Sequence, residues 1–262
     1  MIITSTANPQ VKHLVQLQKK ASARDREGVY LAEGPKMCLE AEPADVAAVY
    51  VSETFWKGAA GSWDRERPEP VLLSDAVFQT VSDTKTPQGI LCVLKQKQYS
   101  REALLGSGTP LLLVLERLQD PGNLGTIMRS AEGAGVTGVL MTKDCVDIYA
   151  PKTIRSTMGA VLHVPFAYTE DLGRDLQWLR EKGVRLYAAH LHGAKAYDRC
   201  SYSGPCAFLI GNESRGLTDE AAMACDERIL IPMLGTVESL NAGIAASLLV
   251  YEAARQRRAD TI

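Results

Sequence analysis

Apolar and polar positions alternate in blocks along the chain from residue 111 onward. Short apolar runs, of which "LLLVLERL" is the most continuous, are typical of buried strands, and the segments between them have helical spacing. Strands are predicted at 111–118, 138–142, 162–168, 185–191, 206–213 and 228–233. Helices are predicted at 123–135, 150–161, 171–183, 219–227 and from about Ser239 to Arg258. This alternation predicts an α/β fold with a parallel sheet.

The first part of the chain has a different pattern. "VAAVYVSE" (46–53) and "GILCVLKQ" (89–96) predict strands, and "SDAVFQTVSD" (74–83) predicts a helix between them. A stretch rich in polar residues, Gly and Pro then precedes the next apolar strand. We therefore expect an N-terminal domain at 1–98, a linker at 99–110 and a C-terminal domain at 111–262.

Charge adds one local feature to this picture. The net charge is −2, so any contact with nucleic acid must come from a local patch. Residues 1–30 contain five basic and two acidic residues, a local sum of +3. Their apolar spacing predicts a helix with a basic flank, which is either a solvated face or an edge that contacts phosphates. The basic residues are Lys12, Lys19, Lys20, Arg24 and Arg26.

The six cysteines form no C-x-x-C pair, and several lie in apolar runs. This favours buried thiols in a reducing compartment over disulfides or a zinc site. His190 and His192 could face the same way, but no third ligand is evident, and we expect no metal. The N-terminus lacks a signal-peptide pattern and no apolar run approaches the roughly 20 residues of a membrane span. The prediction is a cytoplasmic protein that does not enter a membrane.

One glycine motif argues against a nucleotide-dependent oxidoreductase. Gly133, Gly135 and Gly138 form a G-x-G-x-x-G, but it follows a predicted helix and precedes a strand, the reverse of the dinucleotide fingerprint. These glycines are better explained as a helix C-cap and turn. A phosphate-binding P-loop and a G-x-S-x-G nucleophile elbow are both absent from the sequence.

Polar residues gather where predicted strands end. Asn123 stands at the expected N-cap of a helix that carries Arg129 away from its apolar face. Glu213 follows a strand that stops at Gly211, where a glycine lets a ligand approach the main chain. Ser239 can cap the closing helix, whose first turns are made small by Ala242, Gly243, Ala245 and Ala246. Since ligands bind at the carboxyl ends of parallel strands, these segments predict one site.

Three of these segments resemble the SpoU/TrmH family of RNA ribose 2′-O-methyltransferases, within the knotted SPOUT class. They are "NLGTIMRSA", "LIGNESRGL" and "IPMLGTVESLNAGIAASLLVYEAAR", in the family's order, and "STMGAVLHVPF" resembles its middle segment. Residues 1–95, with "VYLAEGPKMCLEA" and "TKTPQGILCVL", resemble the small α/β ribosomal-protein-like substrate-binding domain that often precedes the catalytic domain. The resemblance implies a deep trefoil knot in the C-terminal domain, a homodimer and S-adenosylmethionine as the cofactor.

Residue roles follow from the same resemblance. It implies that Arg129 is the key catalytic residue. Because a guanidinium is too firmly protonated to act as a simple base, our hypothesis is that Arg129 binds the phosphate beside the target ribose. The catalytic residues implied are Arg129, Asn123, Glu213, Ser239 and Asn241. The cofactor-binding residues implied are Gly211, Asn212, Ile231, Pro232, Met233, Leu240, Asn241, Ala189 and His190. RNA contacts are expected at Lys12, Lys19, Lys20, Arg24, Arg26 and Arg155.

The resemblance leaves the substrate open between two RNAs. The additional N-terminal domain favours a large target, 23S ribosomal RNA, over tRNA. A non-catalytic RNA-binding or ribosome-assembly protein with the same fold is the alternative from another class. The presence of Arg129, Glu213, Ser239 and Asn241 argues against it, because a degenerate member is expected to have lost at least one of them.

Overall fold

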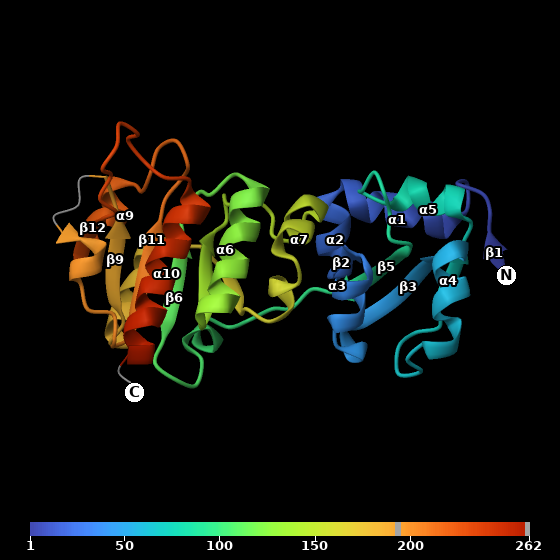
Figure 1. Ribbon diagram of the computed structural model, residues 1–262, viewed down its shortest axis with the longest axis horizontal. Coiled ribbons are helices and arrows are strands. Elements are labelled where there is room, and N and C mark those ends of the chain that lie inside the picture. Colours follow the sequence, from blue (N-terminus) through green and yellow to red (C-terminus); the bar gives the residue numbers. More distant parts are fainter. Residues whose placement is uncertain (192–194, 260–262) are drawn as a thin grey trace. The chain divides into compact units, whose positions relative to one another are not determined.

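A computed structural model describes residues 1–191 and 195–259 of the chain. The contacts divide it into two compact units (Figure 1). Unit 1 comprises residues 1–97 and 147–162, and unit 2 comprises residues 98–146 and 163–262, of which 192–194 and 260–262 lie outside the described residues. No helix of the described residues is long and apolar enough to cross a membrane.

Unit 1 is built on a five-stranded mixed sheet in the order β1-β4-β3-β5-β2. Helices α1 and α5 cover one face of it, where Leu14, Leu17 and Phe78 are fully buried. The strands are β1 (Ile2–Ile3), β2 (Val29–Glu33), β3 (Val46–Ser52), β4 (Val71–Leu73) and β5 (Ile90–Lys95). The helices are α1 (Pro9–Lys19), α2 (Ala21–Glu27), α3 (Pro35–Glu40), α4 (Glu53–Ala59), α5 (Asp75–Val81) and α7 (Pro151–Thr157).

Segment 147–162 belongs to unit 1, although it lies between two strands of unit 2 in the sequence. Helix α7 packs on β2, and the rings of Tyr30 and Tyr149 lie 4.7 Å apart. The buried guanidinium of Arg24 pairs with Asp147 and donates to the Leu17 carbonyl at 2.8 Å. The predicted domain 111–262 includes this segment, because periodicity identifies a helix without indicating the sheet on which it packs.

Unit 2 is a seven-stranded sheet in the order β10-β12-β9-β11-β6-β7-β8, and every pairing is parallel. This confirms the predicted parallel α/β architecture. The strands are β6 (Leu111–Leu115), β7 (Gly138–Thr142), β8 (Phe166–Thr169), β9 (Arg185–Ala189), β10 (Lys195–Ala196), β11 (Cys206–Ile210) and β12 (Glu227–Leu230). The helices are α6 (Pro121–Ala134), α8 (Leu172–Glu181), α9 (Asp219–Met223) and α10 (Ala242–Ala259).

Helices cover both faces of the unit 2 sheet. On one face α8 and α9 bury Leu176, Leu179 and Ala221 against alternate residues of β6, β9 and β11. On the other, α6 and α10 lie side by side (Figure 1). Small residues let these two helices approach closely, because a Cβ on Gly243 would lie 3.1 Å from Thr126, and Ser130 and Ser247 share a hydrogen bond of 2.6 Å. The α6–α10 pair carries the start of both helices to the same end of the sheet.

The cysteines are free thiols, and all except Cys225 are buried. Burial raises the pKa of Cys206 to about 11 and that of Cys225 to about 12. Protonated, enclosed thiols are poor nucleophiles and poor metal ligands. The cysteines therefore serve as core residues.

Arg257 anchors the end of α10 to the opposite end of the sheet. Its guanidinium donates to the carbonyls of Tyr202, Thr109, Pro110 and Gly204 at 2.8–3.0 Å. We expect Arg257→Met to lower the free energy of unfolding by about 2 kcal/mol, because these carbonyls lose a charged donor. Urea denaturation measures this loss. Arg258→Met is the matched control, since Arg258 is exposed, and equal stability of the two variants would contradict the anchoring role.

Candidate active site

Helix α6 begins directly after the buried strand β6. Asp120 is its N-cap and accepts a hydrogen bond from the Asn123 N–H at 2.8 Å, and Pro121 occupies the first helical position. The expectation that Asn123 caps this helix is therefore wrong. An Asp-Pro pair is a known helix start, because proline lacks the N–H that the first turn cannot satisfy. Asn123 is buried in the first turn, and its side chain is free to make contacts outside the helix.

Glu213 joins the loop after β11 to the start of α6. Its carboxylate accepts hydrogen bonds from the Asp120 N–H at 2.9 Å and the Gln119 N–H at 3.1 Å. The Asn123 side-chain amide donates to the same carboxylate at 2.9 Å. The side chain of Glu213, which follows β11, thus accepts hydrogen bonds from backbone N–H groups that follow the neighbouring strand β6.

Hydrogen bonding determines the ionisation of Glu213. Burial by itself raises the pKa of this carboxyl, but the hydrogen bonds from Asn123 and from the backbone of Asp120, Glu213 and Gln119 lower it below its usual value. Donors that point at a carboxylate stabilise its charged form. Glu213 is therefore an anionic anchor at neutral pH, and its hydrogen-bond partners make it unsuited to act as a general acid.

Asn241 extends this network to the start of α10. Its amide donates to the Asn123 side-chain oxygen at 2.7 Å, while its own oxygen accepts from the N–H groups of Gly243 and Ile244 at 2.9 and 3.2 Å. Asn241 therefore caps α10, which begins at Ala242. The expectation that Ser239 caps the helix is wrong, because the chain stays irregular through Asn241. Ser239 is exposed beside this network.

Gly211 is required by the backbone of the loop that follows β11. A Cβ at this position would lie 2.1 Å from Gly216 C and Leu217 N. Asn212 and Gly216 exchange backbone hydrogen bonds of 2.8 and 3.1 Å, and Asn212 also accepts from the N–H groups of Ser214 and Arg215. The loop folds back onto Gly211, so the close approach of its own backbone already requires a glycine at this position. The strand itself ends at Ile210, earlier than predicted.

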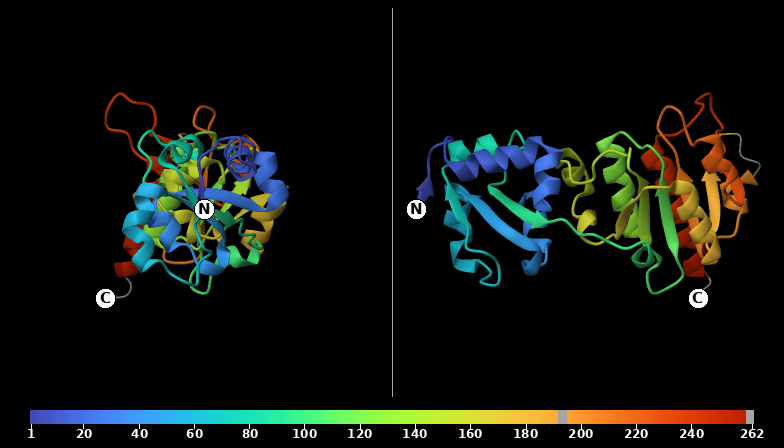
Figure 2. Two further views of the ribbon diagram at one scale, coloured as in Figure 1. Left: turned by 90° about the vertical axis from the view of Figure 1, so that its right-hand side faces the viewer. Right: turned by 180° about the vertical axis from the view of Figure 1, so that it is seen from behind.

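A cavity of about 670 Å³ opens at this end of the unit 2 sheet. Its walls come from the ends of β9, β11 and β12, from the loop 231–241 and from the first turns of α10. Figures 1 and 2 show the loops after β11 and β12 rising from the same end of the sheet. Residues expected to bind a cofactor that line it are Ala189, His190, Gly211, Asn212, Ile231, Met233 and Leu240. Glu213 and Ser239 of the expected catalytic group line it as well.

Pro232 and Asn241 are not among the lining residues, although each neighbours one that is. Pro232 is exposed after β12 has ended at Leu230, as expected of a residue that cannot donate to a ladder. Ala242 and Ala245 of α10 line the cavity, whereas Gly243 packs on α6. The small residues at the start of α10 therefore allow close packing against α6 on one side and leave space for the cavity on the other.

Arg129 lies on the exposed side of α6, six residues after Asn123. Ile127, Met128 and Ala131 are fully buried beneath it, as their spacing predicted. Within the part of the chain that the structure describes, the Arg129 side chain forms no hydrogen bond or ion pair. Its guanidinium keeps all five N–H donors for a ligand.

The residues expected to contact RNA fall into two groups. In unit 1, Lys12 and Lys19 are exposed on α1, Lys20 is exposed between the two helices, and Arg26 is exposed on α2. The expectation that Arg24 contacts RNA is wrong, because Arg24 is only 3% exposed and its side chain is bound to Leu17 and Asp147. The helical pattern did not reveal that this arginine faces inward.

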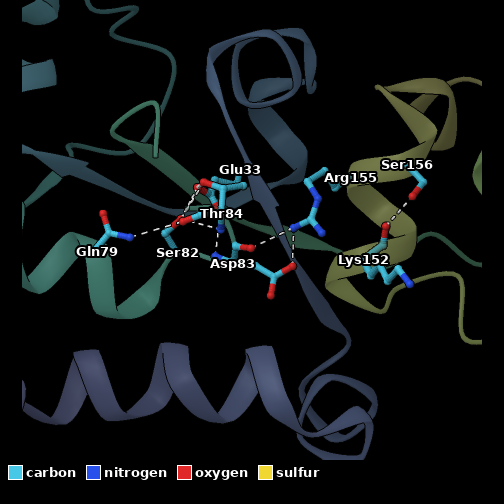
Figure 3. Close-up of polar contacts among 8 residues, drawn as sticks. All are labelled: Glu33, Gln79, Ser82, Asp83, Thr84, Lys152, Arg155 and Ser156. Atoms are coloured by element: carbon cyan, nitrogen blue, oxygen red, sulfur yellow. Dashed lines mark hydrogen bonds and ion pairs between the residues drawn. The ribbon is translucent and has the colours of Figure 1, made fainter. Parts of the chain in front are cut away.

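Arg155 of α7 is exposed but paired. Its guanidinium contacts the Asp83 carboxylate and donates to the Asp83 carbonyl at 3.1 Å (Figure 3). The turn that carries Asp83 is held by Glu33, whose carboxylate accepts from Ser82, Thr84 and the Asp83 N–H. In this arrangement Arg155 is a structural link between α7 and the sheet of unit 1.

His190 lines the cavity, and its backbone N–H donates to the Ile229 carbonyl at 2.9 Å. His192 lies outside the described residues. Among residues 1–191 and 195–259, no group of three His, Cys, Asp or Glu side chains could hold a metal ion.

Two features of the site were missed in the sequence. Glu116, buried at the end of β6, accepts from both the N–H and the hydroxyl of Thr218 at 2.7 Å, which fixes the far end of the loop after β11. Arg117 follows it with a φ of 55°, and its buried Nε has no hydrogen-bond partner in the structure. A strained backbone of this kind costs roughly 1–3 kcal/mol and tends to occur at functional sites. An acid at the end of an apolar strand was the available signal.

Comparison with protein families gives this geometry a context. The model of the SpoU rRNA methylase family matches residues 110–251, and that of the MRM3-like substrate-binding domain matches residues 8–92. The chain belongs to the SpoU rRNA methylase family. Within this SpoU family member, the matched region contains the Glu213–Asn123–Asn241 network and the cavity beside it.

Relatives of this SpoU protein match over nearly the whole chain. A Synechocystis protein described as an uncharacterized tRNA/rRNA methyltransferase is 34% identical over 97% of this chain and 94% of its own length. The 23S rRNA (guanosine(2553)-2′-O)-methyltransferase RlmP of Bacillus subtilis is 31% identical, covering 95% and 97%. The structure of an rRNA methyltransferase from Sinorhizobium meliloti with bound AdoMet has a TM-score of 0.85 and 30% identity, covering 97% of each chain.

Proposed function

We propose that this protein transfers a methyl group from S-adenosylmethionine to a ribose 2′-OH of RNA, with 23S ribosomal RNA as the substrate. The observation that carries the proposal is the cavity of about 670 Å³ next to the network of Glu213, Asn123 and Asn241. The family membership and the relatives named for rRNA methylation support the same reaction. An MRM3-like substrate-binding domain supports ribosomal RNA over tRNA.

The residues around the cavity suit S-adenosylmethionine. Leu240, Leu249 and Ala245 offer apolar surface for a flat base, and the ends of three parallel strands offer backbone groups for polar atoms. Its volume is in the range of small-molecule sites. When bound, the cofactor supplies an electrophilic methyl group. The lining residues proposed to hold it are Gly211, Asn212, Ile231, Met233, Leu240, Ala189 and His190. Pro232 and Asn241, which do not line the cavity, are proposed to position their lining neighbours.

Arg129 is proposed to bind the phosphate beside the target ribose. A guanidinium fork matches two phosphate oxygens, and the rigid helix fixes its direction. Glu213 and Asn123 hold the start of α6 and so fix the position of Arg129. Asn241 ties this assembly to α10, and Ser239 lines the cavity. Orientation and charge, rather than proton abstraction by arginine, then lower the barrier.

Unit 1 is proposed to bind the RNA around the target nucleotide. Lys12, Lys19, Lys20 and Arg26 provide exposed positive charge on α1, on α2 and between them. Such contacts bind the backbone of any sequence and position the substrate without selecting the base. Arg24 and Arg155 are not assigned to this role, because their side chains are engaged within unit 1.

A homodimer and a trefoil knot in unit 2 belong to the same proposal. Ile244, Leu248 and Tyr251 follow one another at helical spacing on α10 and are 50%, 38% and 47% exposed. An apolar stripe of this kind, on the helix that packs beside α6 and its Arg129, is the proposed surface for a second copy of the chain.

The proposed location of the protein is the cytoplasm.

Calorimetry with S-adenosylmethionine tests the proposed function directly. We expect the purified protein to bind it with a Kd in the micromolar range and Leu240→Arg to show no binding, because a charged side chain would then enter the cavity wall. Mapping of 2′-O-methyl groups in RNA from a deletion strain identifies the nucleotide. Absence of binding by the wild type, with and without total RNA, would favour the non-catalytic RNA-binding alternative.

A further inference from the structure

Arg117 occupies a backbone conformation that arginine rarely adopts. Its φ of 55° is left-handed, and among the described non-glycine residues only Met158 shares a positive φ. Three hydrogen bonds hold it there: its N–H donates to the Thr142 hydroxyl at 2.9 Å, and its carbonyl accepts from the Asn212 and Gln119 side chains at 2.8 and 3.2 Å. The surrounding residues thus impose the conformation. Glycine or asparagine would adopt it with less strain.

The guanidinium of Arg117 has no partner among the described residues. Across the described residues it forms no hydrogen bond or ion pair, and its Nε is buried without a partner. Buried donors in folded proteins are nearly always hydrogen-bonded, so an exception calls for a ligand or a functional explanation. Because Nε is buried and the residue as a whole is only half-buried, the two terminal nitrogens of Arg117 are the donors that can contact an anion.

Arg117 is attached to the candidate active site from two sides. The Asn212 side chain that holds its carbonyl also accepts from the backbone of Ser214 and Arg215 at the cavity wall. On the other side, the Gln119 N–H donates to Glu213. Arg117 nevertheless forms no ion pair with Glu213 or any other described acid. A purely structural arginine at this place would be expected to neutralise that carboxylate.

We propose that Arg117 is a substrate-binding residue that holds a backbone phosphate of the RNA next to the nucleotide bound by Arg129. This inference rests on the proposed function and adds a second phosphate contact to it. The guanidinium fork matches phosphate oxygens, and the restrained left-handed backbone limits the directions in which the side chain can extend. Arg117 then contributes to RNA affinity and not to the transfer step.

The variant Arg117→Gly separates this role from a structural one. Glycine accepts a φ of 55° freely, so the variant removes the guanidinium together with the strain. We expect a melting temperature equal to or above that of the wild type. The Kd for 23S rRNA from a strain lacking the gene should rise roughly five- to tenfold near 0.1 M salt, and the slope of log Kd against log salt should fall by about 0.7–0.9. Affinity for S-adenosylmethionine and kcat at saturating RNA should not change.

Two further variants complete the experiment. Arg117→Asn also tolerates the left-handed backbone and should behave like Arg117→Gly. Arg174→Ala removes an exposed arginine of α8 on the other face of the sheet and should leave RNA affinity unchanged. Unchanged RNA affinity and salt slope in Arg117→Gly and Arg117→Asn would overturn the proposal, and a lower melting temperature with them would make Arg117 structural. Absence of methyl transfer by the wild type would refute the proposed function separately, because the salt slope is measured without turnover.

Discussion

Replacing Arg129 by alanine is expected to lower kcat by about 10²–10³-fold, the magnitude found when one preorganised charge-stabilising group is removed. Arg129 is exposed on a helix whose other face is fully buried, so the substitution removes a ligand-facing group and leaves the core intact. The melting temperature and the affinity for S-adenosylmethionine should remain those of the wild type. Single-turnover methylation of rRNA measures the effect on the chemical step.

Arg129→Lys provides the sharper comparison. Lysine keeps the positive charge but presents a single point of contact in place of a planar fork. If the fork geometry orients the phosphate, the lysine variant should lose most of the activity that the alanine variant loses. Near-full turnover by Arg129→Lys would show that charge alone suffices and would remove the argument for a bidentate contact.

Glu213→Gln is expected to lower kcat by about 10²-fold, because a shift of about 1 Å in catalytic groups can have an effect of that size. The carboxylate accepts from the Asp120 and Gln119 N–H groups and from Asn123. A glutamine side chain offers one acceptor oxygen and turns an N–H group toward the remaining donors. The start of α6, and with it Arg129, then loses its fixed position. Glu132→Gln, which changes an exposed acid on the same helix, is the matched control for kcat.

The pH dependence of stability tests the same contact independently. The pKa of Glu213 is lower in the folded protein than the ordinary value of 4.5 for a glutamate side chain. Its contribution to the free energy of unfolding is therefore complete above about pH 4.5 and is lost as the pH falls through the lowered pKa. The stability difference between wild type and Glu213→Gln should be constant at neutral pH and shrink in acid. A difference that grows on acidification would contradict the anionic role of Glu213.

The sequence predicted the elements of unit 2 better than the contacts between them. The buried run of β6, the all-parallel sheet and the αL C-cap at Gly135 follow from local patterns. The N-caps of α6 and α10 did not follow from local patterns. They are Asp120 and Asn241, and not Asn123 and Ser239 as predicted. Several polar residues near a helix start are equally plausible caps, and only the tertiary contacts of Asn123 decide between them.

Long-range partners explain the other differences. Arg24 lies among basic residues in the sequence, and nothing local indicates that Asp147, 123 positions later, draws it into the interior. Arg117 has no sequence signature because its conformation is held by Thr142 at the end of β7, Asn212 after β11 and Gln119 two residues further on. The cavity likewise exists only because three strand ends and one helix start meet. Hydrophobic periodicity describes one helix or strand at a time, so it does not reveal which elements contact each other in the fold.

The assignment of segment 147–162 to unit 1 limits how this protein can be recombined with its relatives. The chain passes between the two units at residues 97–98, 146–147 and 162–163, so a single junction does not separate them. A chimera that exchanges only residues 1–97 would pair a foreign sheet with the native segment 147–162, whose Tyr149 and Asp147 contact Tyr30 and Arg24 in this protein. Transfer of unit 1 between family members therefore requires that residues 1–97 and 147–162 be exchanged together.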